Sequence, residues 1–189
     1  MLEGYRVILG SQSPRRRELL AGLDIEFETL VLTGEEVFPE GLAGEEIPLF
    51  LARQKADAYN GMMDGRTLVI TADTIVWLDG RMYGKPHTEE EAREMLRSLS
   101  GRTHEVITGV CVRGAGREEA FAATTRVMFA RLTEEEIEYY VRKYRPMDKA
   151  GSYGVQEWIG YIGVERIEGS YYNVMGLPVQ RLYGVLKGW

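Results

Sequence analysis

The most constraining feature of this 189-residue sequence is an uninterrupted β-forming run over residues 67–78. The run is rich in Val, Ile and Thr, and it is followed by Asp79-Gly80, a dipeptide typical of two-residue hairpin turns. Met82 and Tyr83 continue the apolar pattern after the turn. We therefore predict one long strand that turns back at Asp79-Gly80 into a short antiparallel partner.

Strand and helix patterns alternate on both sides of this run, which favours a mixed α/β protein. Turn-bounded apolar runs predict further strands at residues 6–9, 26–32, 104–112, 120–130 and 158–167. Apolar periodicity and capping residues predict helices at residues 14–21, 45–59, 88–99, 133–144 and 177–186. No repeat or flexible linker divides the sequence, so we expect a single domain over residues 1–189, built as one body or as two closely joined lobes.

The predicted helices carry recognisable local signals. Three begin with residues suited to the first turn, namely Ser13 with Pro14, Thr88 with Glu91, and Thr133 with Glu136. The last two pairs have the spacing of a capping box, in which each side chain accepts from the other residue's backbone N–H. In the helix at 45–59, the stripe expected to face the core consists of Ile47, Phe50, Leu51, Gln54 and Ala58.

Composition excludes several classes of protein. The net charge of −6 argues against a nucleic-acid binder, because such proteins need a broad basic surface. The one cysteine, Cys111, excludes an intramolecular disulfide and a cysteine-rich zinc site. No apolar run approaches the roughly 18 residues of a membrane span, and the apolar run near the N-terminus is too short for a signal peptide. We expect a cytoplasmic protein, and we interpret His87, His104 and Cys111 as structural or exposed.

Residues 11–17, Ser-Gln-Ser-Pro-Arg-Arg-Arg, lie between a predicted strand and a predicted helix. Such a turn presents unpaired backbone N–H groups at the positive end of the helix dipole. The hydroxyls of Ser11 and Ser13 and the guanidiniums of Arg15 and Arg16 would add groups that bind phosphate. Cations oppose the dipole at a helix N-terminus, so an anionic ligand would explain their placement. The structural alternative is a capped helix with a solvated basic first turn.

Asp73 lies within the predicted long strand, among β-branched neighbours. Aspartate is unfavourable in strands, and a buried carboxylate must be paired with a cation, bound to a metal or protonated. Each of these conditions makes Asp73 a candidate functional group. The structural alternative is a break at this point, with Asp73 capping a turn between two shorter strands.

Other polar positions are weaker candidates. Lys55 falls at the edge of the apolar stripe of the helix at 45–59, from which its ammonium can reach either a cleft or solvent. Lys85 lies in a loop that can hold a charge rigidly, although a loop lysine is usually solvated. The Glu35-Glu36 pair can supply a metal ligand. Gln156 ends a polar, glycine-containing segment that suits a binding loop, and its amide can donate to and accept from one base edge.

The standard phosphate-binding loop, the dinucleotide-binding turn and the hydrolase nucleophile elbow are absent from the sequence. Instead, five blocks resemble the Maf family of nucleoside triphosphate pyrophosphatases. They are LGSQSPRRRELL (9–20), ADTIVWLDGRMYGKP (72–86), LSGRTHEVITGV (99–110), MDKAGSYGVQ (147–156) and YYNVMGLPV (171–179). The resemblance implies the Maf/inosine-triphosphatase-like fold, in which a long twisted mixed sheet and flanking helices form two lobes around a cleft. It also implies hydrolysis of a nucleoside triphosphate to the monophosphate and pyrophosphate, with a divalent cation, Mg²⁺ or Mn²⁺.

The same resemblance assigns roles to individual residues. The family's catalytic base falls on Asp73, and its phosphate-handling turn falls on Ser11, Ser13, Arg15 and Arg16. The other charged residues of its cleft fall on Glu36, Lys55 and Lys85. The branch that acts on dTTP and UTP is similar to this chain at Arg15, Thr74 and Gln156. We expect Asp73 and Glu36 to hold the cation and to orient a water for attack at the α-phosphorus. Residues 32–34 depart from the family pattern, which leaves open whether Glu35 or Glu36 faces the metal.

Two alternatives remain open. One is a house-cleaning pyrophosphatase for modified or 7-methylguanine nucleotides, and the other is a non-catalytic nucleotide-binding regulator of septum formation. The three branch positions argue against the first, and the set of charged residues argues against the second. As partners we expect a small-molecule nucleoside triphosphate and, by base rates and family analogy, a second copy in a homodimer. We expect neither a membrane nor a nucleic-acid partner.

Overall fold

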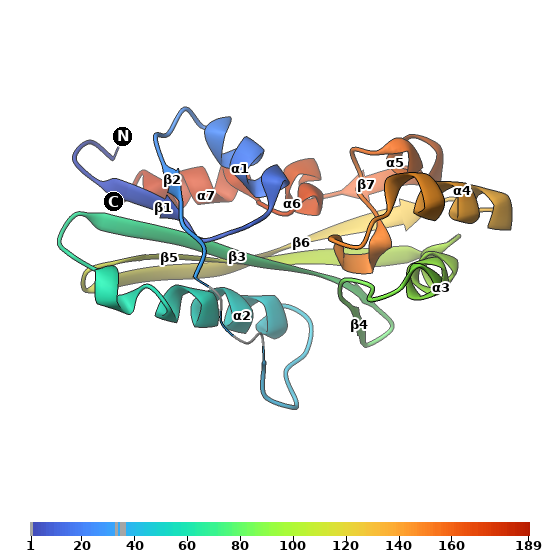
Figure 1. Cartoon of the computed structure of the whole chain (residues 1–189), viewed down its shortest axis with the longest axis horizontal. Helices are drawn as coiled ribbons and strands as arrows, with labels where there is room; N and C mark the ends of the chain where they lie inside the picture. Colours follow the sequence, from blue (N-terminus) through green and yellow to red (C-terminus); the bar gives the residue numbers. More distant parts are fainter. Residues whose placement is uncertain (1, 33, 35–36) are drawn as a thin grey trace. The chain divides into compact units, whose positions relative to one another are not determined.

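The structure, a computed structural model, describes residues 2–32, 34 and 37–189 of the chain (Figure 1). Its helices and strands, with η marking short 3₁₀ turns, are β1 (Arg6–Leu9), α1 (Pro14–Ala21), β2 (Glu28–Thr29), α2 (Glu46–Asp57), η1 (Asn60–Met62), β3 (Thr67–Leu78), β4 (Arg81–Tyr83), α3 (Glu89–Leu99), β5 (Thr103–Gly114), β6 (Arg117–Phe129), α4 (Glu134–Tyr144), η2 (Ala150–Ser152), α5 (Trp158–Gly163), β7 (Val164–Glu168), α6 (Tyr171–Met175) and α7 (Val179–Leu186).

The described strands form one seven-stranded mixed sheet in the order β2-β1-β3-β5-β6-β7, with β4 paired to β3. Strand β1 runs parallel to β2 and β3, whereas β4 is antiparallel to β3 and β7 is antiparallel to β6. After β3, Asp79 and Gly80 have φ angles of 51° and 76°. Positive φ at both positions is what a tight hairpin turn of this kind requires. The predicted hairpin and the mixed α/β class are therefore confirmed.

The chain divides into two compact units, each assembled from separate segments. Unit 1 comprises Met1–Asp73, Thr108–Ala123 and Gly176–Trp189, and unit 2 comprises Thr74–Ile107 and Thr124–Met175. The boundaries fall inside β3, β5 and β6, so these long strands contribute to both units.

In unit 1, helix α2 covers one face of the strands, and helices α1 and α7 cover the opposite face (Figure 1). Small side chains let α2 approach the sheet closely, because Ala52 and Ala56 pack on the buried Cys111 of β5. A Cβ at Gly109 would lie only 2.2 Å from the carbonyl oxygen of Pro48 in α2. The position of α2 on the sheet therefore depends on a glycine in β5.

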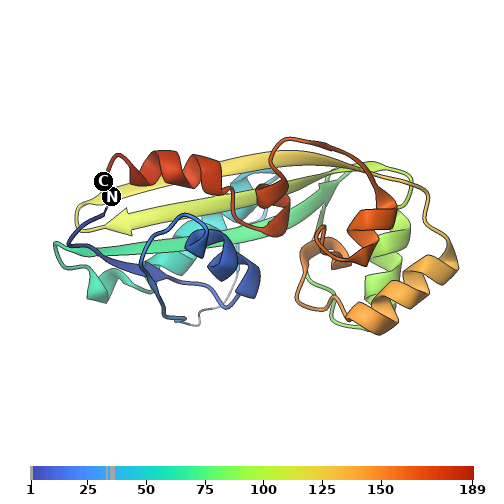
Figure 2. The same ribbon diagram turned by 90° about the horizontal axis from the view of Figure 1, so that it is seen from above.

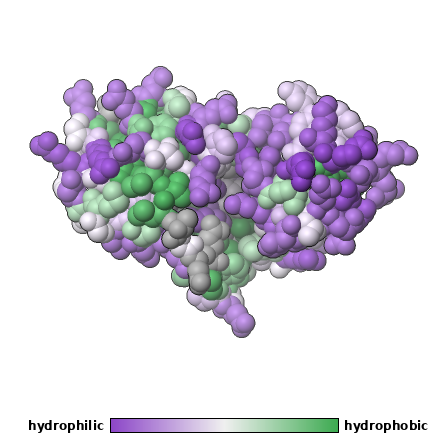
Figure 3. All heavy atoms as spheres, in the orientation of Figure 1, coloured by the Kyte–Doolittle hydropathy of each residue, from purple (hydrophilic) through white to green (hydrophobic). Residues whose placement is uncertain are grey.

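In unit 2, helices α3 and α4 pack against each other (Figure 2). Ion pairs join their solvent-facing sides, with Arg93 on Glu138 at 2.5 Å and Arg97 on Glu134 at 3.0 Å. Accordingly, the surface over these two helices is mostly hydrophilic on the face seen in Figure 3. The predicted capping box at Thr133 and Glu136 is formed at the start of α4.

Two predicted strands are wrong in extent or type. Residues 26–32 form only the two-residue β2, because the Tyr59 hydroxyl donates to the carbonyl of Leu30 at 2.6 Å and accepts from the N–H of Leu32 at 3.1 Å. The Tyr59 hydroxyl thus takes the place of a strand partner at the Leu30 carbonyl and the Leu32 N–H, whereas the N–H of Leu30 still donates to the carbonyl of Leu9 at 3.3 Å. Residues 158–167 form helix α5 and then the short β7, rather than one strand.

The turn into α5 explains the second difference. The N–H of Gly160 donates to the carbonyl of Glu157 at 2.8 Å, and a Cβ at Gly160 would lie 1.8 Å from the carbonyl oxygen of Val155. Only glycine tolerates this approach. A short apolar run is compatible with both a helix and a strand. Here the close approach of Gly160 to the Val155 carbonyl favours the helix.

Helix boundaries also differ in places. The helix predicted at 45–59 is observed as α2, which ends at Asp57, and the turn η1 follows at Asn60–Met62. Ala58, just after α2, is exposed, whereas Ala52 and Ala56 are buried. Phe50 and Gln54 of the expected stripe are half-buried. The helix predicted at 177–186 begins at Val179. Helix α6 was not predicted from the sequence.

At the start of α3, the predicted capping box is only half formed. The Thr88 hydroxyl accepts from the N–H of Glu91, but the Glu91 carboxylate accepts from the N–H of His87 instead of Thr88. His104 and Cys111 are buried and His87 is exposed, which confirms their interpretation as structural or exposed. No helix within the described ranges has both the length and the apolar character needed to cross a bilayer.

Candidate functional site

The turn between β1 and α1 is held by the two serines predicted there. Ser11 Oγ accepts from the N–H of Ser13 at 3.2 Å, and Ser13 Oγ accepts from the N–H of Arg16 at 3.4 Å. A Cβ at Gly10 would lie 2.8 Å from the Tyr59 hydroxyl and 2.9 Å from the methyl carbon of Thr71, so glycine suits this crowded position. The predicted helix start at Ser13 and Pro14 is confirmed.

Arg16 is anchored rather than solvated. Its Nε donates to the carbonyl of Gly176 at 2.8 Å, and its Nη1 donates to the carbonyl of Ala72 at 2.8 Å. Nη1 also lies 3.4 Å from Ser11 Oγ. These three partners are uncharged, and together they orient the guanidinium. Arg15, the preceding residue, is half-buried, whereas Arg17 is exposed.

The sheet explains why Arg16 reaches Ala72. Strand β1 ends at Leu9, which is in register with Ile70 of β3, and the N–H of Gly10 donates to the carbonyl of Ile70. In a parallel pair, alternate carbonyls face the same neighbour. The Ala72 carbonyl therefore faces the side that β1 has just left, and Arg16 supplies the hydrogen bond that a longer β1 would have made.

Asp73 lies in the uninterrupted strand β3, so the alternative of a break at this residue is wrong. Its side chain is mostly buried, with 8% of the residue exposed, and Lys55 Nζ lies 2.6 Å from its Oδ1. A buried carboxylate must be paired with a cation, bound to a metal or protonated, and the structure shows pairing with a cation for Asp73. Lys55 comes from the last turn of α2. The site in unit 1 therefore brings together Ser11, Ser13, Arg16, Lys55 and Asp73.

Three predicted residues belong to unit 2: Thr74, Lys85 and Gln156. The loops that carry Lys85 and Gln156 are joined, because the N–H of Gly151 donates to the carbonyl of Gly84 at 3.0 Å. Gly151 also packs on β3, since a Cβ there would lie 2.7 Å from the side chain of Val76. Lys85 is exposed, and the Oε1 atom of the half-buried Gln156 is buried without a hydrogen-bond partner.

Only one of the two predicted metal ligands, Asp73, lies within the described residues. Glu36, like Glu35, lies outside the described residues, so its role stays a prediction. Within the part of the chain that the structure describes, no three His, Cys, Asp or Glu side chains are grouped to hold a metal ion. Of the two carboxylates predicted to hold the metal, Asp73 is therefore the one that the structure describes.

Sequence reasoning missed the groups that hold Arg16. The carbonyl of Gly176 lies in the block 171–179, to which we had assigned no role, and Gly176 has a φ of 114°. Positive φ there favours glycine. The glycine within a block that resembles the family was the available signal. No feature of the sequence indicated that its carbonyl accepts from Arg16, 160 residues away.

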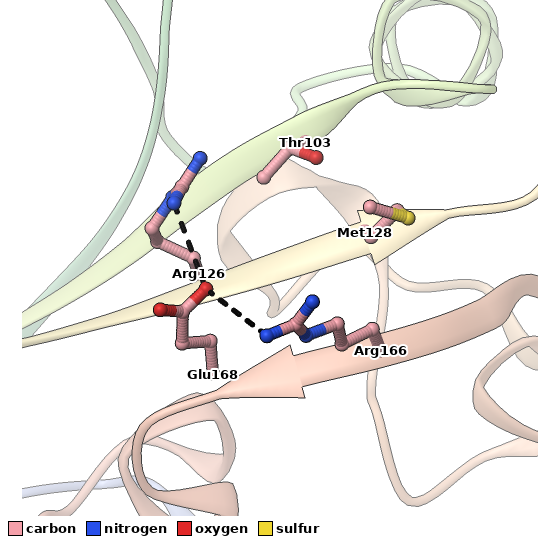
Figure 4. A pocket seen from close by; sticks show the side chains of 5 residues that line it. All are labelled: Thr103, Arg126, Met128, Arg166 and Glu168. Carbon is pink, nitrogen blue, oxygen red and sulfur yellow. Dashed lines mark ion pairs between the residues drawn. The ribbon is translucent and has the colours of Figure 1, made fainter.

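A separate hollow of about 170 Å³ is lined by residues of unit 2 alone (Figure 4). Its lining residues are Thr103, Arg126, Met128, Arg166 and Glu168. The Glu168 carboxylate lies 3.6 Å from Arg126 and 3.9 Å from Arg166. No predicted site residue lines this hollow, and its charged side chains pair with one another, so we assign it no role.

Known proteins are similar to this chain over nearly its whole length. The family model described as "Maf-like protein" matches residues 6–189. A "dTTP/UTP pyrophosphatase" of Phocaeicola vulgatus is 62% identical over 98% of this chain and 97% of its own length. A protein of the same name from Porphyromonas gingivalis is 58% identical over 98% of this chain and 95% of its own length. Among solved structures, the Staphylococcus aureus Ham1 protein is similar in fold, with a TM-score of 0.53 at 17% identity, covering 97% of this chain and 98% of that one. The chain belongs to the Maf-like protein family.

Proposed function

We propose that this protein is a nucleoside triphosphate pyrophosphatase that hydrolyses dTTP and UTP to the monophosphate and pyrophosphate. The observation that carries the proposal is the mostly buried Asp73, paired with Lys55, next to the residue whose carbonyl anchors Arg16. The names of relatives with 62% and 58% identity supply the substrates. A cytoplasmic location is part of the proposal, because nucleoside triphosphates are intracellular metabolites.

The negative charge of the proposed substrate explains the basic side chains of the site. A triphosphate carries about four negative charges, and further charge develops on the leaving pyrophosphate. Arg15, Arg16, Lys55 and Lys85 would neutralise it, with the guanidiniums gripping phosphate oxygens through paired hydrogen bonds. Ser11 and Ser13 would add hydroxyl donors at the same turn. An anchored guanidinium such as Arg16 loses little conformational entropy when an anion binds.

Asp73 is the proposed catalytic base. A water oxygen bonds to the α-phosphorus, the bond from that phosphorus to the bridging oxygen breaks, and pyrophosphate leaves with the electron pair. The proton of the water passes to the Asp73 carboxylate. The ammonium of Lys55, 2.6 Å from Oδ1, fixes the direction of this carboxylate.

The donor chemistry fits a divalent cation. Mg²⁺ is usually bound by one or two carboxylates together with substrate phosphates and waters. Asp73 offers one such carboxylate, and Glu36 would be the second. When bound, Mg²⁺ or Mn²⁺ would polarise the phosphate oxygens and favour ionisation of water.

We propose that Gln156 takes part in base selection. Thymine and uracil carry an imide N–H that cytosine lacks, and the buried Oε1 of Gln156 has no hydrogen-bond partner. An unmatched buried acceptor favours a ligand that brings a donor. Thr74 and, in unit 1, Arg15 complete the branch-specific set by resemblance.

A substrate panel tests the proposal. Pyrophosphate release is measured for the common nucleoside triphosphates and for 7-methylguanosine triphosphate, each with and without Mg²⁺ or Mn²⁺. We expect dTTP and UTP to react fastest, dCTP at least about tenfold more slowly, and all turnover to need the metal. A preference for the methylated guanine nucleotide, or binding without turnover, would contradict the proposal.

A further inference from the structure

One buried hydroxyl in unit 2 connects two parts of the loop that carries Gln156. Tyr140 of α4 is fully buried, and its ring stacks on Tyr144 with centroids 5.1 Å apart. Its hydroxyl accepts from the N–H of Gly154 at 3.0 Å and donates to Oε2 of Glu157. A phenol has one proton to donate, so this hydroxyl uses its donor on Glu157 and an acceptor site on Gly154.

These two partners are the ends of the turn that contains Gln156. The N–H of Glu157 donates to the carbonyl of Gly154 at 3.0 Å, which closes a four-residue turn with Gln156 at its third position. Tyr140 is therefore bonded to the first and the fourth residue of this turn. The backbone of such a turn fixes the direction in which the Cα–Cβ bond of its third residue leaves the chain.

The carboxylate of Glu157 is committed to this arrangement. Glu157 precedes α5 as its N-cap, yet its side chain makes no capping hydrogen bond. Its Oε1 lies 3.1 Å from Nζ of Lys149, which is only 8% exposed and also lies 2.8 Å from Asp148. Packing leaves no spare room, because a Cβ at Gly154 would lie 3.0 Å from both Lys149 and Glu157 side-chain atoms.

We propose that Tyr140 is a positioning residue for base recognition, which acts through Glu157 and Gly154 to hold the side chain of Gln156. The inference rests on the function proposed above, since it concerns how the same enzyme selects thymine and uracil. Burial and the neighbouring Glu157 raise the pKa of Tyr140, so its hydroxyl stays protonated and keeps donating at any working pH.

The test compares two Tyr→Phe variants. Tyr140→Phe keeps the buried ring and removes only the hydroxyl. Tyr153→Phe is the matched control, because Tyr153 is also buried in unit 2 and its hydroxyl bonds His104 at 2.7 Å rather than the turn. We expect Tyr140→Phe to lower the ratio of kcat/KM for dTTP over dCTP by at least about tenfold, mainly through a higher KM for dTTP. Tyr153→Phe should leave that ratio unchanged even if its melting temperature falls as much.

An unchanged ratio in Tyr140→Phe, or an equal change in both variants, would overturn the proposal. If Tyr140→Phe does not fold, Glu157→Ala replaces it, since that variant removes the acceptor of the Tyr140 hydroxyl. The same loss of selectivity is expected, and its absence counts equally against the proposal.

A second readout does not depend on turnover. The protein is labelled with ¹⁵N-glutamine, and the side-chain amide NMR signals of Gln156 are assigned by their loss in Gln156→Ala. These signals should be sharp in the wild type and in Tyr153→Phe. In Tyr140→Phe they should be broadened or shifted. Inactivity of the wild type toward dTTP and UTP would reject the proposed function, whereas unaltered Gln156 signals in Tyr140→Phe would reject the positioning role.

Discussion

The ammonium nitrogen of Lys55 lies 2.6 Å from Oδ1 of Asp73, joining the last turn of α2 to the interior of β3. Neither residue is fully buried, with side-chain exposures of 22% and 12%, so the pair is accessible to a ligand while most of it is shielded. This pairing gives a mostly buried carboxylate within a β-strand the cation that its burial requires.

Asp73→Asn should abolish turnover, with a loss of at least about a thousandfold in kcat, because an amide can neither accept the proton of water nor bind a cation strongly. The measurement is pyrophosphate release at saturating dTTP, with the melting temperature as a check on folding. Asp79→Asn is the control, since Asp79 lies in the turn that ends the same strand, where asparagine is equally suited to positive φ. Near-normal turnover of Asp73→Asn would reject Asp73 as the base.

Arg16→Lys should lower kcat/KM for dTTP by about ten- to a hundredfold. A lysine ammonium cannot reproduce the planar guanidinium that bonds the carbonyls of both Ala72 and Gly176. Steady-state kinetics of this variant are compared with those of Arg17→Lys, in which the neighbouring exposed residue is changed the same way. If both variants behave alike, the anchoring of Arg16 does not matter for catalysis.

Gly109→Ala should destabilise the fold by about 1–3 kcal/mol or more, because the added methyl group would meet the backbone of α2. Activity should fall as well, since α2 carries Lys55. Urea denaturation measures the free energy of unfolding, and Gly61→Ala is the control because a Cβ there has open space around it. Equal stability of the two variants would show that α2 can shift without cost.

His104 predicts a pH dependence of stability. Burial lowers the pKa of His104 from 6.5 to about 4, so the unfolded chain binds a proton between these values while the folded chain does not. The free energy of unfolding should therefore fall as pH drops from about 6.5 to 4, by about 3 kcal/mol for this group. Above pH 6.5 its contribution is fully present.

The check is urea denaturation across this range for the wild type and for His104→Phe, which removes the titrating ring. The difference between the two curves isolates His104 from the carboxylates. Parallel curves would mean that His104 is protonated in the folded state as readily as in the unfolded state.

Local structure was predictable wherever neighbouring residues decide it. The hairpin at Asp79-Gly80 follows from two residues that tolerate positive φ, and the start of α1 follows from a serine cap and a proline. The strand predicted at 158–167 failed because its apolar run fits two periods, and a contact between Gly160 and the Val155 carbonyl decides between them.

The sequence by itself identified the candidate residues of the site, because a carboxylate among β-branched residues and arginines at a helix start are unfavourable without partners. Only the tertiary structure decided what those partners are. Lys55 and Asp73 are 18 residues apart, and Arg16 and Gly176 are 160 apart. Such contacts depend on the register of β1 against β3 and on how closely α2 packs at Gly109, which arise from the packing of distant segments and not from any local preference of the chain.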